Sequence, residues 1–303
     1  MTPNPTRLTP ATALLLTVPP LLWAGNAVVG RLLRDAISPL TLNFARWGLA
    51  LVLLLPLAAV VLRGASPLWA HWRRYAMLGL LGIGLYNALQ YLALQTSSAL
   101  NVTLLVGASL PFWMLAVGTL CFGQRVRPAQ VAGAVLSMIG VLLVLGQGDW
   151  RHLLALRLVP GDLYMMLTTA CWAFYSWLLV GTREPAGIRQ DWAAFLLAQV
   201  VFGAAWSGVF ALGEWGLGAG RLEAGWTLAA ALAFIAIGPA VIAFRCWSGG
   251  VQRAGPTAAA FFINLTPLFA ALLSAAFLHE LPHWYHGAAF ALIVGGIVLS
   301  SRR

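Results

Sequence analysis

The stretch Ala99–Leu145 reads ALNVTLLVGASLPFWMLAVGTLCFGQRVRPAQVAGAVLSMIGVLLVL and indicates how the chain is built. An apolar run contains Pro111, a polar elbow follows at Gln124–Pro128, and a second apolar run completes the unit. Gly255–Ser301 repeats this order, with an elbow at His279–His283. A proline inside a helix frees a backbone carbonyl and kinks the helix. In hydrocarbon the freed group needs a neighbouring helix or a polar cavity. Two matching kinked pairs therefore predict two similar halves around a shared cavity.

The composition is that of a membrane protein. Of the 303 residues, 61% are hydrophobic and 9% are charged, against about 25% charged in soluble domains. A soluble fold of this length could not bury so much apolar surface. The net charge of +10 comes from arginines that lie mostly between apolar runs, which is typical of residues that hold loops in the cytoplasm. The three cysteines show no metal-ligand spacing. We expect no nucleic-acid partner, no metal and no cofactor.

A transmembrane helix needs about 20 mostly apolar residues. On this rule the sequence predicts an all-α membrane protein with ten spans, at about residues 10–33, 38–62, 73–94, 98–121, 128–146, 161–182, 191–212, 225–247, 256–278 and 283–301. The predicted organisation is a tail over 1–9, a first repeat over 10–146, a connecting loop over 147–160, a second repeat over 161–301 and a short C-terminus at 302–303.

Each half has five spans, an odd number, so the second half enters the membrane from the opposite side and is inverted relative to the first. Inverted repeats place a binding site near the middle of the membrane, between the halves. Twelve arginines fall in one set of loops and termini and five in the opposite set. This asymmetry predicts that both termini are cytoplasmic. We expect a multi-pass monomer in the lipid bilayer of a bacterial inner membrane.

Two segments near the N-terminus resemble a known family. Leu22-Trp-Ala-Gly-Asn-Ala-Val-Val-Gly-Arg31 and Ile37-Ser-Pro-Leu-Thr-Leu-Asn-Phe-Ala-Arg46 resemble the opening of EamA-type carriers of the drug/metabolite transporter superfamily. The segments 111–140 and 255–296 resemble that family's fourth–fifth and ninth–tenth helix pairs. The resemblance covers essentially the whole chain and implies ten spans, an internal repeat and a transporter, not an enzyme. Within the superfamily, the chain looks most like bacterial exporters of aromatic amino acids.

The elbow after the fourth and ninth spans departs from this family. EamA carriers usually have Gly-Glu there, whereas this chain has Gly123-Gln124 in the first copy and His279-Glu280 in the second. We therefore assign the elbow no role in ion coupling. Every acidic residue of the chain falls in a predicted loop or at a span end, although proton relays in carriers commonly place a carboxylate at mid-membrane. We expect transport without obligatory ion coupling.

Polar and aromatic side chains inside the spans are candidates for the cavity wall, because such groups at membrane depth usually face the bundle interior. In the first span Trp23 and Asn26 share a helix face. In the third span Tyr86 and Gln90 share one face, and Tyr91 lies on another. For each of them, packing between helices is the alternative role. The predicted substrate-binding residues of the whole chain are Trp23, Asn26, Tyr86, Gln90, Tyr91, Asn101, Trp172, Tyr175 and Asn264.

The sixth span carries Trp172 and Tyr175 on one stripe, and under the duplication Trp172 takes about the place of Trp23. Two tryptophans facing each other across a pseudo-two-fold axis would form a stacking cavity for a ring. Asn101 and Asn264 precede the two kinks, where an amide beside a freed carbonyl can bind an ammonium or amide group, or simply repair the kink.

Arg46 lies inside the second span, about 12 Å from its outer edge at about 1.5 Å per residue. Two roles are open for this charge. In the structural role, Arg46 pairs with carbonyl groups or with Asp35. In the functional role, it attracts the carboxylate of a substrate.

These observations predict export of aromatic or large neutral amino acids and related metabolites by alternating access through a central cavity. The alternative is a broad exporter of drugs or cationic compounds, with proton coupling as an option. Cation binding would favour a buried carboxylate, although cation–π contacts with tryptophans could replace it.

Overall fold

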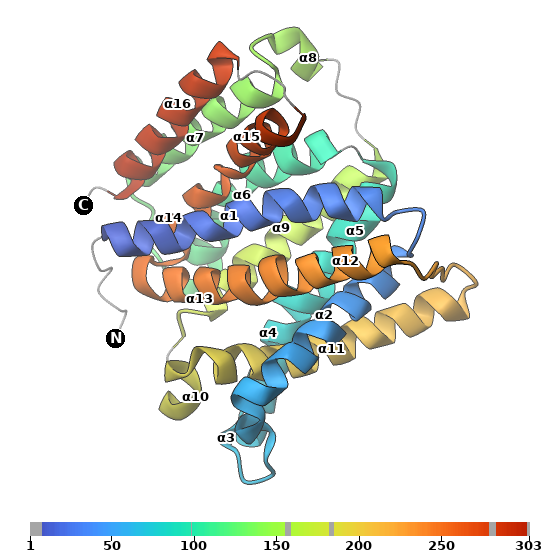
Figure 1. Ribbon diagram of the computed structural model, residues 1–303. Helices are drawn as coiled ribbons and strands as arrows, with labels where there is room; N and C mark the ends of the chain where they lie inside the picture. Colours follow the sequence, from blue (N-terminus) through green and yellow to red (C-terminus); the bar gives the residue numbers. More distant parts are fainter. Residues whose placement is uncertain (1–7, 98, 155–158, 182–184, 279–282, 302–303) are drawn as a thin grey trace.

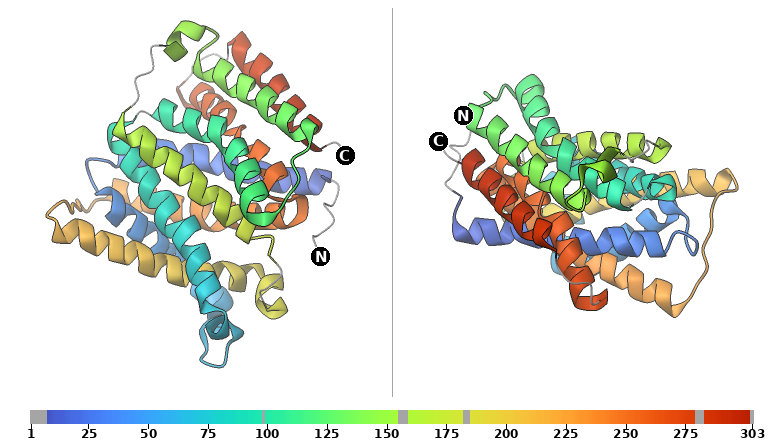
Figure 2. Two further views of the ribbon diagram at one scale, coloured as in Figure 1. Left: turned by 180° about the vertical axis from the view of Figure 1, so that it is seen from behind. Right: turned by 90° about the horizontal axis from the view of Figure 1, so that it is seen from above.

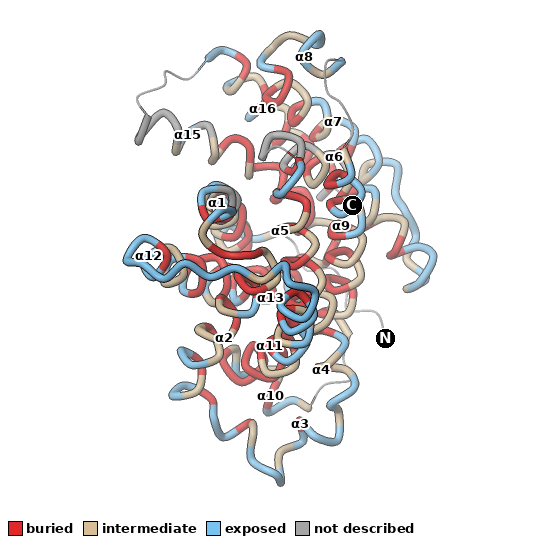
Figure 3. The backbone as a smooth tube through the Cα atoms, turned by 90° about the vertical axis from the view of Figure 1, so that its right-hand side faces the viewer, coloured by how far each residue is buried: buried red, intermediate tan, exposed pale blue. Residues whose placement is uncertain are grey.

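The computed structural model describes residues 8–97, 99–154, 159–181, 185–278 and 283–301. These residues form a bundle of helices, and the only β contact among them is a two-residue bridge between Ile37 and Leu222. Buried positions run through the middle of the bundle, whereas the loops and short helices at its ends are more exposed (Figure 3). The prediction of an all-α protein is confirmed for this part of the chain.

Each predicted span corresponds to one helix or to consecutive helices (Figure 1). The helices are α1 (Pro10–Leu32), α2 (Pro39–Ala58), α4 and α5 (Trp72–Gly79 and Tyr86–Thr96), α6 (Ala99–Phe122), α7 (Pro128–Leu145), α9 (Pro160–Leu178), α11 (Trp192–Gly216), α12 and α13 (Trp226–Ile235 and Ala243–Ala254), α14 and α15 (Pro256–Ile263 and Thr266–Leu278) and α16 (Trp284–Ser301). Short helices in the connections are η1 (Ala59–Leu62), α3 (Pro67–Ala70), α8 (Trp150–Leu154) and α10 (Ala186–Gln190).

The described helices have the length and composition of membrane spans. Seven are long and apolar enough to cross a membrane, and shorter apolar helices cover Pro256–Ala270 and Trp284–Ser300. Six of the described helices begin at a proline, namely α1, α2, α3, α7, α9 and α14. Proline suits this position because its missing N–H would have no partner inside the helix and its fixed φ is helical. These prolines therefore mark helix boundaries directly in the sequence.

The structure corrects the expectation of a kinked ninth span. The ninth range is not one kinked helix, because α14 ends at Ile263 and α15 begins at Thr266. Pro267 therefore stands in the first turn of a new helix, where it interrupts no hydrogen bond. The predicted connecting loop over 147–160 contains the helix α8. Pro111 does lie inside α6, as predicted. The elbow residues 279–282 lie outside the described residues.

The last helices of the two halves, α7 and α16, pack side by side (Figures 1 and 2). A Cβ atom on Gly133 would come within 2.6 Å of the Gly296 carbonyl oxygen, and one on Gly140 within 3.0 Å of the Ala289 carbonyl oxygen. Glycine lets the two backbones touch here. The order of these contacts makes the two helices antiparallel. Ala289 and Gly296 lie 156 positions after Gly133 and Gly140. When each residue is replaced by its equivalent 156 positions away, the Gly133–Gly296 contact becomes the Gly140–Ala289 contact, as expected for two equivalent helices.

The third and eighth ranges share an irregularity. The π-helix η2 (Leu80–Leu85) joins α4 to α5, and the π-helix η3 (Ala236–Ile242) joins α12 to α13. Both begin at positions related by the same shift of 156 residues. π-Helical turns are rare and often occur at functional sites.

The halves interleave around these segments. The first-half helix α1 packs against α13, α14 and α15, whereas the second-half helix α9 packs against α5 and α6. This exchange brings α1, α5, α9 and α13 to the centre of the bundle.

Candidate functional site

An aromatic cluster lies where α1, α5, α9 and α13 meet. Trp172 of α9 is at its centre, and its ring centroid lies 4.4 Å from that of Tyr86 and 5.2 Å from that of Trp23. It also contacts Tyr175, Phe244 and Trp247, at 4.9, 5.4 and 5.4 Å. These are the separations of stacked and edge-to-face ring pairs. The aromatic cluster is thus Trp23, Tyr86, Trp172, Tyr175, Phe244 and Trp247.

The polar edges of these rings are tied to the surrounding helices. The Trp23 indole N–H donates to the Pro239 carbonyl of η3 at 3.1 Å. The Tyr175 hydroxyl donates to the Gln199 side-chain oxygen of α11 at 3.0 Å. The Trp172 indole N–H is buried and has no hydrogen-bond partner among the described residues. The centre of the cluster therefore keeps one unused donor.

The sequence predicts that Trp23 and Trp172 face each other across a stacking cavity. The structure brings the two indoles together, but they touch edge to face with planes at 88°. No space for a ring separates them in this conformation. The rings pack directly on one another, as is usual in a close-packed protein interior.

A polar group, here called the amide network, adjoins the cluster and consists of Asn26, Arg46, Asn87, Gln90 and Tyr91. One guanidinium nitrogen of Arg46, Nη1, donates to the Asn87 oxygen at 2.7 Å, the Tyr91 hydroxyl at 3.1 Å and the Asn26 oxygen at 3.4 Å. The Tyr91 hydroxyl donates to the Asn26 oxygen at 3.1 Å, and the Asn26 amide lies 3.5 Å from the Gln90 oxygen. Predicted residues from the first and third spans therefore meet beside one buried cation, which the second span supplies.

The predicted pairing of Arg46 with Asp35 is wrong. Asp35 pairs instead with Arg34, at 3.2 Å on the exposed end of the bundle. Arg46 is completely buried, and its planar group lies over the Trp47 ring with 5.1 Å to the centroid. Its position inside α2 keeps it too deep to reach the carboxylate at the helix end.

Asn264 lies at the break between α14 and α15 and is completely buried. Both polar atoms of its amide lack a hydrogen-bond partner among the described residues. Repair of the break falls to Thr266, whose hydroxyl donates to the Ile263 carbonyl at 2.6 Å. Asn264 is therefore not needed for the repair. The side chain of Asn101 lies outside the described part of the chain.

Two buried carboxylates lie at helix ends, away from the middle of the bundle. Asp162, in the first turn of α9, accepts from the Val159 N–H at 2.9 Å and from the Ser97 hydroxyl at 2.5 Å. Glu214, near the end of α11, accepts from the Leu40 and Thr41 N–H groups at the start of α2. Anions at helix N-termini are favourable because free N–H groups point at them. These two carboxylates therefore have structural partners.

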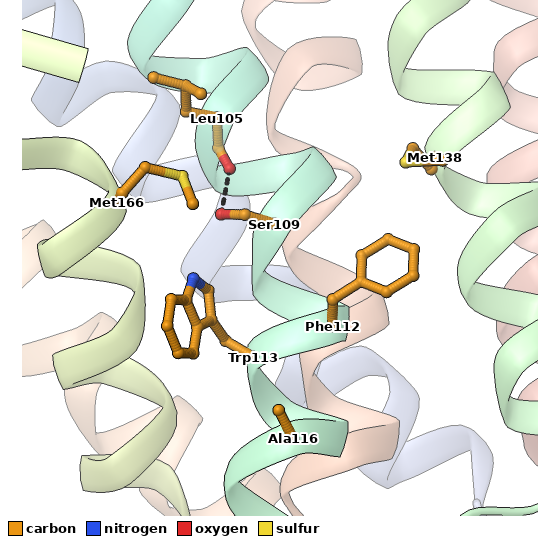
Figure 4. Close-up of a pocket in the computed structure, with 7 residues that line it drawn as sticks. All are labelled: Leu105, Ser109, Phe112, Trp113, Ala116, Met138 and Met166. Atoms are coloured by element: carbon orange, nitrogen blue, oxygen red, sulfur yellow. Dashed lines mark hydrogen bonds between the residues drawn. The ribbon is translucent and has the colours of Figure 1, made fainter. Parts of the chain in front are cut away.

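A separate apolar hollow of about 410 Å³ lies between α6, α7 and α9 (Figure 4). Its one hydroxyl, on Ser109, donates to the Leu105 carbonyl at 2.5 Å. Trp113 and Phe112 extend from opposite sides of α6. The remaining lining residues are Ala116, Met138 and Met166. Such a lining suits an apolar group and provides little hydrogen bonding.

Sequence reasoning missed several residues at the centre. Phe244 and Trp247 stand three residues apart in the eighth span, which is the signal of a shared face, and Trp247 is 156 residues after Tyr91. Asn43 donates to the Ile83 and Gly84 carbonyls of η2, at 3.3 Å each. No sequence signal distinguishes it, because the π-helix it supports is itself not apparent from the sequence.

Comparison with known proteins places the chain in a family. A model of the "EamA-like transporter family" matches residues 11–146 and 159–302. An "Uncharacterized transporter" of Archaeoglobus fulgidus is 27% identical over 292 residues, covering 96% of this chain and 98% of the relative. "Aromatic amino acid exporter YddG" of Ancylobacter novellus is 28% identical over 242 residues, covering 80% and 78%. A solved crystal structure shares the fold, with a TM-score of 0.72, 23% identity and coverage of 96% and 98%. The chain belongs to the EamA-like transporter family.

Proposed function

We propose that this membrane transporter exports aromatic and large neutral amino acids and related metabolites through the centre of the bundle. The aromatic cluster carries the proposal. It gathers six rings from four helices and both halves, and the amide network lies beside it. A substrate ring entering the cluster would replace contacts between protein rings with equivalent contacts of its own. Asn26 and Gln90 would supply hydrogen bonds to the polar part of the substrate.

Alternating access explains how substrate reaches a cluster that is closed in this conformation. The proposal requires two inverted halves that rock against each other. The antiparallel α7–α16 pair, the matched π-helices η2 and η3 and the interleaved helices α1 and α9 support this inverted arrangement. Rocking of the halves would part the rings of α1 and α5 from those of α9 and α13, opening the cluster to one side at a time.

The proposed transport has no obligatory ion coupling. Among the described residues, the buried carboxylates Asp162 and Glu214 cap helix ends and are occupied by hydrogen bonds. A proton relay would need a carboxylate near the aromatic cluster. Substrate would therefore move down its own gradient.

The test is counterflow in proteoliposomes loaded with unlabelled phenylalanine, followed by entry of labelled phenylalanine with and without a pH gradient. We expect saturable entry that an imposed pH gradient does not drive uphill. Trp172→Leu should weaken apparent affinity by about tenfold, because it removes several ring contacts worth roughly 0.5–1.5 kcal/mol each. Trp177→Leu is the matched control, since Trp177 is also buried in α9 but stacks on Phe122 outside the cluster. Equal effects of the two substitutions would count against a site at the cluster.

The second candidate is a broad exporter of drugs or cationic compounds, with proton coupling as an option. The apolar hollow lined by Phe112, Trp113 and Met138 favours it, because such a surface accommodates hydrophobic molecules without specific hydrogen bonds. Movement of a hydrophobic cation such as tetraphenylphosphonium, driven by a pH gradient, in the absence of amino-acid counterflow would favour this candidate.

We also propose that the chain crosses a bacterial inner membrane ten times as a monomer, with both termini in the cytoplasm. The arginine distribution supports the orientation. Fusion of a reporter that fluoresces only in the cytoplasm to the C-terminus tests the orientation, and light scattering of the detergent complex tests the oligomeric state.

A further inference from the structure

Arg46 is a buried cation whose hydrogen bonding is incomplete. The residue is completely buried, and only one nitrogen of its guanidinium, Nη1, has hydrogen-bond partners among the described residues. The other two nitrogens, Nε and Nη2, are buried and have none. A guanidinium carries five N–H donors, so three of them point to no acceptor. Leaving such donors unpaired in the interior is costly.

The charge of Arg46 is also not balanced. Its three partners are the neutral side chains of Asn26, Asn87 and Tyr91. The ion pair that the described residues form is the exposed one between Arg34 and Asp35. The buried carboxylates of Asp162 and Glu214 are bound at helix ends. A buried charge without a counter-ion is strongly unfavourable, which implies that an anion compensates Arg46 during part of the transport cycle.

The geometry of the unused nitrogens indicates which anion. Nε and Nη2 form one edge of the planar guanidinium, and this edge matches the two oxygens of a carboxylate in a pair of parallel hydrogen bonds. Two features fix the orientation of that edge: the three bonds made by Nη1, and the Trp47 ring beneath the plane, whose centroid lies 5.1 Å from the guanidinium carbon. The protein therefore holds a preformed carboxylate receptor and gives it no internal carboxylate.

The receptor adjoins the aromatic cluster. The Trp47 ring packs on Phe244 with centroids 4.9 Å apart, and Phe244 packs on Trp172 at the centre of the cluster. On α5, Asn87, which binds Arg46, directly follows Tyr86, which stacks on Trp172. A molecule with a ring and a carboxylate separated by a short chain could thus contact both sites.

We infer that the Nε–Nη2 edge of Arg46 binds the carboxylate of the transported substrate while the aromatic cluster binds its ring. This inference rests on the proposed transport of aromatic amino acids and goes further, because it makes a free carboxylate a requirement. The substrate class is then aromatic carboxylates, with or without an amino group. Aromatic amines and amides of similar shape are excluded, since they leave the guanidinium uncompensated.

The test needs no variant in its first part. In the wild-type protein, uptake of labelled phenylalanine is measured against four unlabelled competitors, namely phenylalanine, 3-phenylpropionate, phenylalaninamide and phenethylamine. We expect the two carboxylates to compete at least about tenfold better than the amide and the amine, as is typical of losing a charge-assisted bidentate contact. Equal competition by phenylalanine and phenylalaninamide would overturn the inference and leave aromatic transport intact. Absence of any phenylalanine flux would instead overturn the proposed function and this inference with it.

Variants then test whether Arg46 causes the preference for substrates with a free carboxylate. Arg46→Gln should reduce the preference for acid over amide to about one, and Arg46→Lys should keep a weakened preference, because it retains the charge but not the two-pronged edge. Arg245→Gln is the control, since its guanidinium lies over Trp192 at 4.2 Å near a helix end, outside the network. Elution volume and thermal midpoint identify the folded variants. A folded Arg46→Gln that keeps the wild-type acid preference would overturn the inference.

Discussion

Replacing Glu214 with glutamine tests how the two halves are joined at one end of the bundle. The Glu214 carboxylate of α11 accepts four hydrogen bonds at the start of α2. Oε2 accepts from the Ser38 hydroxyl at 2.6 Å, the Thr41 hydroxyl at 2.7 Å and the Thr41 N–H at 2.8 Å, and Oε1 accepts from the Leu40 N–H at 3.1 Å. Glu214 therefore acts as the N-terminal cap of a helix from the other half.

The structure permits an estimate of the cost. A glutamine amide has one acceptor oxygen, so its NH2 group must face at least one donor. The less costly arrangement keeps the oxygen at the Oε2 position and turns the NH2 toward the Leu40 N–H. One bond is then lost, and three bonds fall from the charge-assisted range of roughly 1.5–3 kcal/mol to the neutral range of roughly 0.5–1.5 kcal/mol each. Summed over the four bonds these losses come to roughly 4–8 kcal/mol. Because bonds that share one carboxylate are not fully additive, we expect Glu214→Gln to lower the free energy of unfolding by about 4 kcal/mol or somewhat more.

The measurement is the unfolding free energy from titration with sodium dodecyl sulfate in mixed micelles. Glu223→Gln is the matched control, because the Glu223 side chain is exposed and its structural contact is a backbone bond to Ala36. Glu214→Ala should cost more than Glu214→Gln, since it removes all four bonds. If Glu214→Gln and Glu223→Gln unfold at the same detergent fraction, the carboxylate contributes no cap and the reasoning is refuted.

Three further substitutions test the packing and the centre of the bundle by the same titration. Gly296→Ala places a Cβ atom 2.6 Å from a backbone oxygen of α7 and should lower the free energy of unfolding by about 1–3 kcal/mol. The control Gly287→Ala places its Cβ atom where nothing lies within 4 Å and should leave stability unchanged. Equal unfolding midpoints of the two variants would contradict the close packing of α7 and α16. Asn87→Leu removes the 2.7 Å contact with Arg46 and should cost about 2–3 kcal/mol, and a neutral result would mean that the guanidinium finds other partners. Tyr175→Phe removes a 3.0 Å hydrogen bond to an amide of α11 and should cost about 1–2 kcal/mol; unchanged stability would show that the amide re-pairs.

The sequence determined the helical membrane architecture of this protein. Hydropathy and proline act within contiguous residues, so apolar runs of span length and prolines at helix starts could be read directly. The shift of 156 residues that relates Pro111 to Pro267 likewise supports a duplication. Polar and aromatic groups in apolar spans face the bundle interior, and this rule predicts seven residues that lie in the aromatic cluster or the amide network. They are Trp23, Asn26, Tyr86, Gln90, Tyr91, Trp172 and Tyr175.

The partners of these residues were decided by the tertiary structure alone. Trp23 and Trp172 touch although 149 positions separate them, because α1 packs in the second half and α9 in the first. The π-helices η2 and η3 were not predicted from the local sequence. Pro267 indicated a kink, but not that one helix ends at Ile263 and the next begins at Thr266. Above all, nothing in the sequence around Arg46 says whether Asp35 can reach it. That depends on the depth of the guanidinium in the assembled bundle, which is fixed by contacts between distant helices.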